Sequence, residues 1–392
     1  MKEYKLAIGW RIFLYIVAPL FSLLMIWVIL MPLFPGTKDS MSSGTYWIVA
    51  PICIGMIVLM VLAVLDTNKA KFVITHDKVY SIGLFSYKEL LFSEIKGYRL
   101  SKEYIFIEPT EKGTKRIKIT TYIGKKDELI EWLSSYYHDL DILQAQQEEQ
   151  EILSNEEFGW DEEQRMQKLK NAHKITKAFN WLGGIVGAWT LFWPKPYDYA
   201  VNVSIIIPII AIIIQKLSGG IIKIANTKNS PYPDIFWAIL APSMALCLRA
   251  LFDYNIFDYS NLWMSLLALG LLFTGLLATG NKEIKFKQVN DYLAILGLMV
   301  FSFGYAYGTV ICLNGVYDKS EPQIYTAKIV SKRVSSGKTR TYYFEVTPWG
   351  PQKQNEEVTV SSELYNKHTE GDQVAIYFKK GLFEIPWFVV AD

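Results

Sequence analysis

The residue types that most often do chemistry in proteins are few and scattered in this chain. The four histidines lie far apart in sequence and outside the apolar runs: His76, His138, His173 and His368. The three cysteines lie inside or at the ends of apolar runs: Cys53, Cys247 and Cys312. Because neither polar region holds a cysteine, the sequence predicts no disulfide framework and no thiolate metal cluster. We therefore expect no metal site, no cofactor and no catalytic constellation.

Two ionisable residues share one apolar run, four positions apart. Arg249 lies inside the run and Asp253 lies at its outer end. Ionisable groups within a membrane span are costly and often mark the pathway of a transported solute. At this spacing on a helix an Arg and an Asp also pair locally, and Arg249 is long enough to extend to the membrane surface. The second interpretation is favoured, and the two residues remain a candidate intramembrane polar pair.

One segment resembles a phosphate-binding loop. Ser336-Gly-Lys-Thr339 contains the GKT of that motif, but the motif needs a glycine where this chain has Lys332. A helix should also follow, whereas Tyr342-Tyr-Phe344 continues in a strand pattern. The segment is therefore interpreted as a hairpin turn.

Glycines recur at the GxxxG spacing in two apolar runs. The pairs are Gly183 with Gly187 and Gly304 with Gly308. Small residues at this spacing let two helix backbones approach closely. The spacing predicts close packing among the chain's own helices, with a homo-oligomer face as the alternative.

The composition indicates which elements carry these residues. The chain has 392 residues, of which 51% are hydrophobic and 20% charged, with a formal net charge of +2. Soluble proteins carry about a quarter charged residues, and here the apolar excess is concentrated in long runs. This excludes a single soluble globule and a disordered chain. Strong nucleic-acid binding is also excluded, because 40 Lys and Arg nearly cancel 38 Asp and Glu.

Seven apolar runs are long enough to cross a bilayer core about 30 Å thick. They are Trp10–Leu33, Trp47–Leu65, Ala178–Trp193, Tyr199–Leu217, Ile235–Phe252, Leu262–Thr279 and Tyr292–Leu313. The third is the weakest, and Trp189 and Trp193 are its expected interface anchors. The sequence therefore predicts a polytopic α-helical membrane protein of about seven spans.

Lysines in the short loops orient these spans. With the N-terminus in the cytosol, the inner loops hold eight lysines: Lys2, Lys5, Lys216, Lys223, Lys228, Lys282, Lys285 and Lys287. The outer loops hold Lys38 and Lys195. Because cytoplasmic loops are enriched in Lys and Arg, the asymmetry predicts that residues 66–177 are cytosolic and residues 314–392 extracytoplasmic.

The insert 66–138 changes to the alternating pattern of half-buried strands. The expected strands are Phe72–Thr75, Val79–Ile82, Lys88–Phe92, Ile95–Leu100, Tyr104–Glu108 and Arg116–Thr120. An amphipathic helix follows at Lys125–Tyr137, with apolar residues at spacings of three and four. Short antiparallel strands closed by one helix are the plan of a pleckstrin-homology (PH)-type sandwich. The polar segment 139–177 is expected to be a charged helical linker.

The two-span hairpin 1–65 followed by "KFVITHDKVYSIGLFSYKELLFSEIKGYRL" and "KRIKITTYIGKKDELIEWL" resembles the bacterial PH-like membrane proteins over residues 1–138. The resemblance implies a bacterial plasma (inner) membrane location and a binding or scaffolding module beside the membrane, not an enzyme. Six basic residues form its candidate anionic-lipid face: Lys112, Lys115, Arg116, Lys118, Lys125 and Lys126. Each basic residue near an anionic leaflet contributes about 1 kcal/mol of attraction. The favoured alternative is a solvated strand face with acids such as Glu108 nearby.

After the five-span bundle 178–313, the tail 314–392 has a strand pattern throughout. The expected strands are Ile324–Val334, Arg340–Thr347, Glu357–Ser361, Gln373–Phe378 and Leu382–Val390, with a helical turn at Ser362–Asn366. Glycine-containing turns separate them. The segment "HTEGDQVAIYFKKGLFEIPWFVV" weakly resembles OB-like small barrels, so a small β-barrel domain is expected.

These features favour a non-enzymatic scaffold or sensor with binding modules on both sides of the membrane. The alternative is a small-solute transporter or channel that uses the bundle 178–313. Membrane lipids are expected partners, with envelope or membrane proteins as further candidates and nucleic acid excluded.

Overall fold

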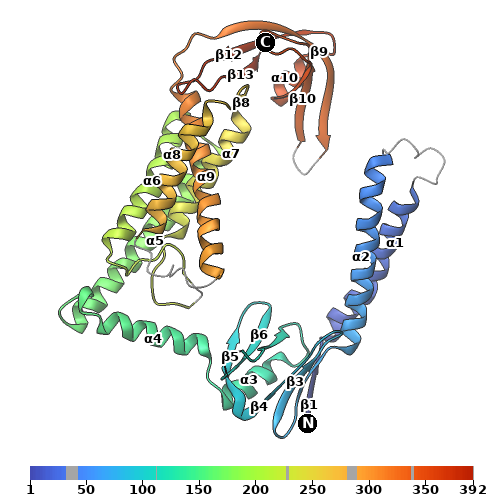
Figure 1. The fold of residues 1–392 in the computed structure, drawn as a ribbon, viewed down its shortest axis with the longest axis vertical. Helices are drawn as coiled ribbons and strands as arrows, with labels where there is room; N and C mark the ends of the chain where they lie inside the picture. Colours follow the sequence, from blue (N-terminus) through green and yellow to red (C-terminus); the bar gives the residue numbers. More distant parts are fainter. Residues whose placement is uncertain (32–42, 112, 227–228, 280–288, 337–339, 392) are drawn as a thin grey trace. The chain divides into compact units, whose positions relative to one another are not determined.

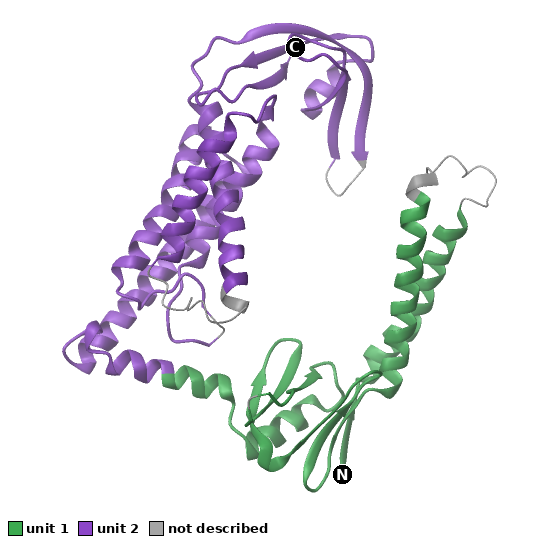
Figure 2. Cartoon of the chain, in the orientation of Figure 1, with its two compact units in different colours: residues 1–147 green, residues 148–392 purple. Residues whose placement is uncertain are grey.

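The computed structural model describes residues 1–31, 43–111, 113–226, 229–279, 289–336 and 340–391. The chain divides into two compact units, residues 1–147 and residues 148–392 (Figure 2). The division falls within the predicted linker 139–177, inside the helix α4 (Leu140–Ser154).

The first unit begins with a helical hairpin. Helix α1 spans Ile8–Leu30, and helix α2, Ser43–Lys69, packs antiparallel to it (Figure 1). Large apolar side chains such as Leu20 and Leu59 are more than 60% exposed. A contiguous apolar surface of this size is unfavourable in water and favourable in a lipid bilayer. The exposed apolar surface of the hairpin therefore indicates that it lies in a membrane.

Seven strands and one helix form the polar part of the first unit. One antiparallel sheet has the order β1 (Lys2–Lys5), β2 (Lys71–Ile74), β3 (Lys78–Ile82) and β4 (Tyr87–Leu91). The other contains β5 (Ile95–Leu100), β6 (Tyr104–Pro109) and β7 (Ile117–Thr120). Helix α3, Lys126–Tyr136, follows and buries Leu129 and Leu133 in the same core as Val79, Leu90 and Ile105. Burial alternates along β6 and β7, which matches the period of two in the sequence.

The second unit contains a bundle of five helices in its described part. They are α5 (Glu162–Phe192), α6 (Tyr197–Leu217), α7 (Phe236–Asp253), α8 (Leu262–Ala278) and α9 (Val289–Val316). Helix α7 packs against α5, α6 and α9, and α8 packs against α9. The β domain lies at one end of this bundle, and the chain enters α5 at the other end (Figure 1).

Five helices among the described residues are long and apolar enough to cross a membrane, which indicates a membrane-embedded protein. The candidate spans are Ile8–Leu30, Tyr46–Lys69, Tyr197–Leu217, Phe236–Asp253 and Tyr292–Val316. Two further expected runs are also helical: α8 is apolar but has 17 residues, and the run Ala178–Trp193 forms the second half of the longer, mixed helix α5.

The β domain is antiparallel and nearly closed into a barrel. Its strand order is β11 (Glu356–Val360), β10 (Arg340–Val346), β9 (Gln323–Ser336), β12 (Gln373–Lys379), β13 (Trp387–Ala391) and β8 (Asn255–Ile256). A short helix α10, Ser362–Lys367, follows β11. The last strand starts at Trp387 and not at the expected Leu382, because residues 381–385 form a turn with left-handed backbone at Gly381 and Glu384.

Candidate functional site

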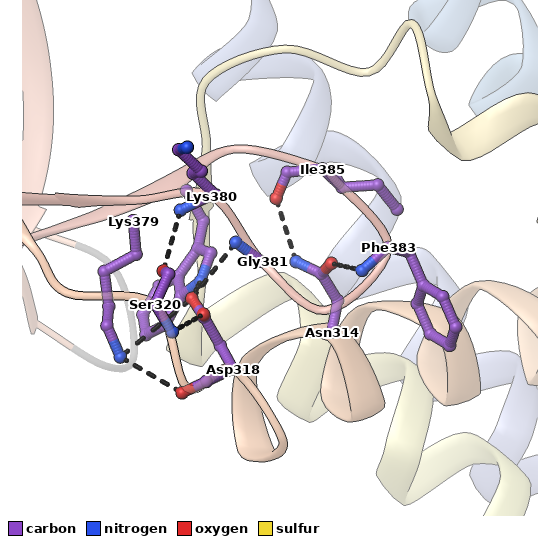
Figure 3. Close-up of polar contacts among 9 residues, drawn as sticks. Asn314, Asp318, Ser320, Lys379, Lys380, Gly381, Phe383 and Ile385 are labelled. Atoms are coloured by element: carbon purple, nitrogen blue, oxygen red, sulfur yellow. Dashed lines mark hydrogen bonds and ion pairs between the residues drawn. The ribbon is translucent and has the colours of Figure 1, made fainter.

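A network of polar contacts lies where α9 meets the β domain (Figure 3). Asn314, in the last turn of α9, has no solvent exposure. Its amide nitrogen donates to the carbonyl of Ile385 at 2.9 Å, and its amide oxygen accepts the N–H of Phe383 at 2.9 Å. The carbonyl of Asn314 accepts the N–H of Leu382 at 3.0 Å. One side chain thus satisfies both a donor and an acceptor of the 381–385 turn.

Gly381 makes this contact possible. Its φ of +80° lies in the left-handed region, where a side chain is strained. A Cβ at this position would also lie 2.3 Å from the amide nitrogen of Asn314. The turn therefore needs glycine to reach the helix end.

Asp318 is the second anchor of this junction, and its side chain is 1% exposed. Its carboxylate accepts the backbone N–H of Gly381 at 3.1 Å and the indole N–H of Trp387 at 2.9 Å. It also accepts the N–H of Ser320 at 2.8 Å, and the Lys379 ammonium lies 3.9 Å away. Burial alone would raise the pKa of Asp318, but the hydrogen bonds from Ser320, Trp387 and Gly381 together lower the pKa below its ordinary value. The site therefore holds a charged carboxylate.

The loop between α7 and α8 belongs to the β domain as well as to the bundle. Its strand β8 pairs with β13, with Trp387 opposite Ile256 and Phe388 opposite Asn255. The next residue, Phe257, donates its N–H to the carbonyl of Pro386 at 2.8 Å. The Phe257 ring packs on Trp349 and Phe378 in the core of the barrel. The barrel is therefore joined to the helix ends at two separate places.

Arg249 and Asp253 lie at the same end of the bundle as the β domain. Arg249 pairs with Asp253 at 3.0 Å and donates to the carbonyls of Thr190 and Leu191 at 2.8 and 2.7 Å. Those carbonyls are in the last turn of α5, where a cation also interacts favourably with the helix dipole. The Tyr197 hydroxyl of α6 donates to Asp253 at 2.8 Å. The pair therefore connects three helices, and these contacts are structural.

The four glycines of the GxxxG pairs differ in their surroundings. A Cβ on Gly183 would lie 2.4 Å from the Cα of Ala238, and one on Gly187 would lie 2.8 Å from the backbone of Ala241. Both neighbours are on α7. A Cβ on Gly308 would lie 2.6 Å from the backbone nitrogen of Cys247, also on α7, whereas one on Gly304 would meet only the sulfur of Cys247 at 3.9 Å. Three of the four glycines thus lie in close contacts within the chain.

The predicted basic face lies on the β5–β7 sheet and at the start of α3. Lys118, on β7, has its ammonium 3.5 Å from the centre of the Tyr104 ring. Arg116, just before β7, lies over Phe106 at 4.4 Å and pairs with Glu108 at 3.3 Å. The remaining described members are Lys115 in the loop before Arg116 and Lys125 and Lys126 at the start of α3. Lys112 lies outside the described residues.

Lys125 has φ of +58° and lies 3.8 Å from Glu128. Glu128 is itself bonded to Lys2 at 2.8 Å, and the hydrogen bond from Lys2 lowers the pKa of this glutamate. Acidic side chains therefore offset part of the positive charge of this face. Lys118 differs, because its ammonium lies against an aromatic ring and forms no ion pair with any residue that the structure describes.

The junction residues were not predicted as a site from the sequence. An Asn and an Asp just before and after the end of an apolar helix are a local signal of a helix end. Their partners at 379–387 are more than sixty positions away, and no pattern in the sequence pairs them. The strand β1 was also missed, because Lys2–Lys5 shows no apolar alternation and pairs with β2 only through the fold.

In the described ranges no group of three or more His, Cys, Asp or Glu side chains is placed to hold a metal ion, and the three cysteines are free thiols. Searches with the sequence and the structure find no matching protein-family model, no matching curated protein and no matching solved structure.

Proposed function

We propose that this chain is a non-enzymatic membrane sensor or scaffold. Binding to its C-terminal β domain changes the structure at the ends of the membrane helices. The observation that carries the proposal is the sharing of secondary structure between the two parts. Strand β8 comes from the α7–α8 loop, and the 381–385 turn is bonded to Asn314 of α9. A displacement of β13 or of this turn moves the ends of three helices, since a hydrogen-bonded, packed junction transmits strain.

The proposal includes seven membrane crossings. The five long apolar helices, the apolar α8 and the second half of α5 support this number. With the N-terminus in the cytosol, residues 66–138 form a cytosolic module and residues 314–392 an extracytoplasmic one, in a bacterial plasma membrane. Two sheets of four and three antiparallel strands followed by α3 support a PH-type module. Its cation-on-aromatic surface at Lys118 and Tyr104 is proposed to contact anionic lipids.

Amide hydrogen exchange on the full chain in detergent tests the coupling, with Phe344→Leu as the perturbation. Phe344 is fully buried in β10, three strands away from β13 in the sheet order. We expect faster exchange not only in β9–β12 but also at residues 314–316 and 255–256. Phe72→Leu, a matched change in the core of the first unit, should leave the exchange of residues 314–316 unchanged. Faster exchange confined to residues 323–391 would overturn the coupling.

A second experiment separates the sensor from the transporter. Purified protein is reconstituted into vesicles that contain fluorescent reporters of H⁺, Na⁺ and K⁺. The sensor proposal expects fluxes equal to those of empty vesicles. A flux above that background, abolished by a change at Arg249 that preserves the fold, would favour the transporter alternative.

A further inference from the structure

A groove of about 560 Å³ lies between α5 and the start of α7. Its α5 wall contains His173, Lys177 and Trp181, and its other wall contains Asp234 and Trp237. The elements that line this groove, α5 and the segment before α7, meet at the end of the bundle opposite the β domain (Figure 1). The groove therefore has no part in the junction described above.

The groove is placed at the expected edge of the bilayer. Helix α7 begins at Phe236, which is also the first residue of a candidate span. Trp237 and Trp181 are 56% and 68% exposed, and Trp is enriched at membrane interfaces. On α5, His173, Lys177 and Trp181 follow each other at intervals of four, so they lie on one face about 6 Å apart along the axis. Lys177 therefore lies one turn towards the water from the Trp181 ring.

Hydrogen bonds fix the two walls relative to each other. The Asn180 amide donates to the carbonyl of Asp234 at 2.9 Å and accepts the N–H of Ala238 at 3.0 Å. A ring nitrogen of His173 lies 2.9 Å from the carbonyl of Pro231. Asp234 accepts the N–H of Phe236 at 3.2 Å, so its carboxylate is held at the start of α7. The groove is thus a formed feature of the bundle.

The charges of the lining match one class of ligand. Lys177 contributes a cation from one wall, and Asp234 contributes an anion from the other. The ammonium of Lys177 makes no ion pair within the ranges that the structure describes. The opposite formal charges of Lys177 and Asp234 suit a zwitterion with separated phosphate and ammonium groups better than a net anion.

We propose that this groove binds the phosphoethanolamine headgroup of a membrane phospholipid. The phosphate lies beside Lys177, the primary ammonium beside Asp234, and the Trp181 and Trp237 rings flank the glycerol region. A primary ammonium donates hydrogen bonds to a carboxylate, whereas the quaternary ammonium of a choline headgroup has no N–H to donate. The inference rests on the membrane location of α5 and α7 and is independent of the sensor proposal.

Lipid binding is measured on the delipidated full chain in detergent by native mass spectrometry. The probes are dioctanoyl phosphatidylethanolamine, phosphatidylglycerol and phosphatidylcholine. We expect the ethanolamine lipid to bind at least about 5-fold more tightly than either of the others. Tighter binding of phosphatidylglycerol, or equal binding of all three, would overturn the proposal.

Three substitutions assign the binding to the groove. Lys177→Gln should weaken ethanolamine-lipid binding about 5-fold, a loss typical of one basic residue at a lipid surface. Asp234→Asn retains an oxygen that accepts the Phe236 N–H but removes the charge, so it should abolish the preference over phosphatidylglycerol. Lys174→Gln is the matched control, because Lys174 is exposed on α5 outside the groove lining. An equal effect of Lys174→Gln and Lys177→Gln would contradict the assignment.

Discussion

At the scale of single residues, Asn314 and Asp318 each bond several groups of the β domain from the end of α9. An amide donates and accepts at once, so Asn314 satisfies two backbone groups of one turn. A carboxylate accepts several hydrogen bonds, so Asp318 binds a backbone N–H of the 381–385 turn and the indole N–H of Trp387 on β13. Because both are almost fully buried, leaving their partners unpaired costs more than the bonds themselves contribute.

Asp318→Asn should destabilise the β domain at neutral pH by about 1–3 kcal/mol. The pKa of Asp318 is lower in the folded chain than its ordinary value of 3.8. The stabilisation from its charged form is therefore present above that ordinary value and is lost as the pH falls below it. Thermal unfolding in detergent, followed between pH 7 and pH 3, should show a difference between wild type and variant that narrows with acid. A constant difference across this range would show that the charge contributes nothing.

At the scale of elements, the ends and contact faces of the helices decide how the bundle is held. Arg249 caps the last turn of α5 from α7, and Asp253 receives the hydroxyl of Tyr197 from α6. The exposed fractions of the two charged side chains are 18% and 25%. Removal of either partner leaves the other charge poorly solvated, and removal of Arg249 also leaves two carbonyls of α5 without their donor.

Arg249→Leu should therefore lower the free energy of unfolding by about 3–5 kcal/mol, whatever the protein's function. The double variant Arg249→Leu with Asp253→Leu should cost less than the sum of the two single changes, since it leaves no unpaired charge. Urea unfolding in micelles measures the free energy of unfolding of the wild type, the two single variants and the double variant. Additive losses would show that the two side chains act separately. Loss of flux in an Arg249 variant therefore favours the transporter only where the variant is shown to be folded.

The glycine contacts give a second set of expectations for the helices. Gly183→Ala places a methyl group against the backbone of α7 and should destabilise the bundle by about 1–3 kcal/mol. The neighbouring Gly184 faces open space, so Gly184→Ala should be neutral or stabilise by up to about 1 kcal/mol. Thermal melting of the purified protein distinguishes the two. Similar losses in both variants would mean that these glycines matter only through helix propensity.

On α9, alanine substitution should affect the two glycines of one predicted GxxxG pair differently. Gly308→Ala meets the backbone of α7 and should destabilise, whereas Gly304→Ala meets only a sulfur at ordinary contact distance and should be tolerated. Size-exclusion chromatography of each variant reports any change in oligomeric state. A tolerated Gly308→Ala together with a disrupted oligomer for Gly304→Ala would favour the dimer-face interpretation of Gly304.

At the scale of the whole molecule, the number of crossings decides which compartment each module occupies. In a variant with Cys53, Cys247 and Cys312 replaced by Ala, a single cysteine is placed at Ser362 or at Lys102, both exposed. With seven crossings, a membrane-impermeant thiol reagent labels position 362 in intact cells and position 102 only after lysis. Protection of both positions until lysis would indicate an even number of crossings. The two modules would then share the cytosol.

Local patterns in the sequence determined most of the elements. The six strands expected in residues 66–138 lie within two residues of β2–β7, because alternation of apolar side chains is a local property. The apolar runs predicted the membrane helices for the same reason, and the spacing of apolar residues at three and four positions predicted α3.

Tertiary structure alone decided which of these elements meet. Strand β1 forms because β2 offers it a free edge, although its own four residues carry no strand pattern. Gly304 and Gly308 have the same motif, but only the surroundings of Gly308 bring it against the backbone of α7. Asn314 and Asp318 gained their role from partners more than sixty residues away. Sequence periodicity reports which face of an element is buried, whereas the identity of the partner is fixed only when the packed chain satisfies its buried polar groups.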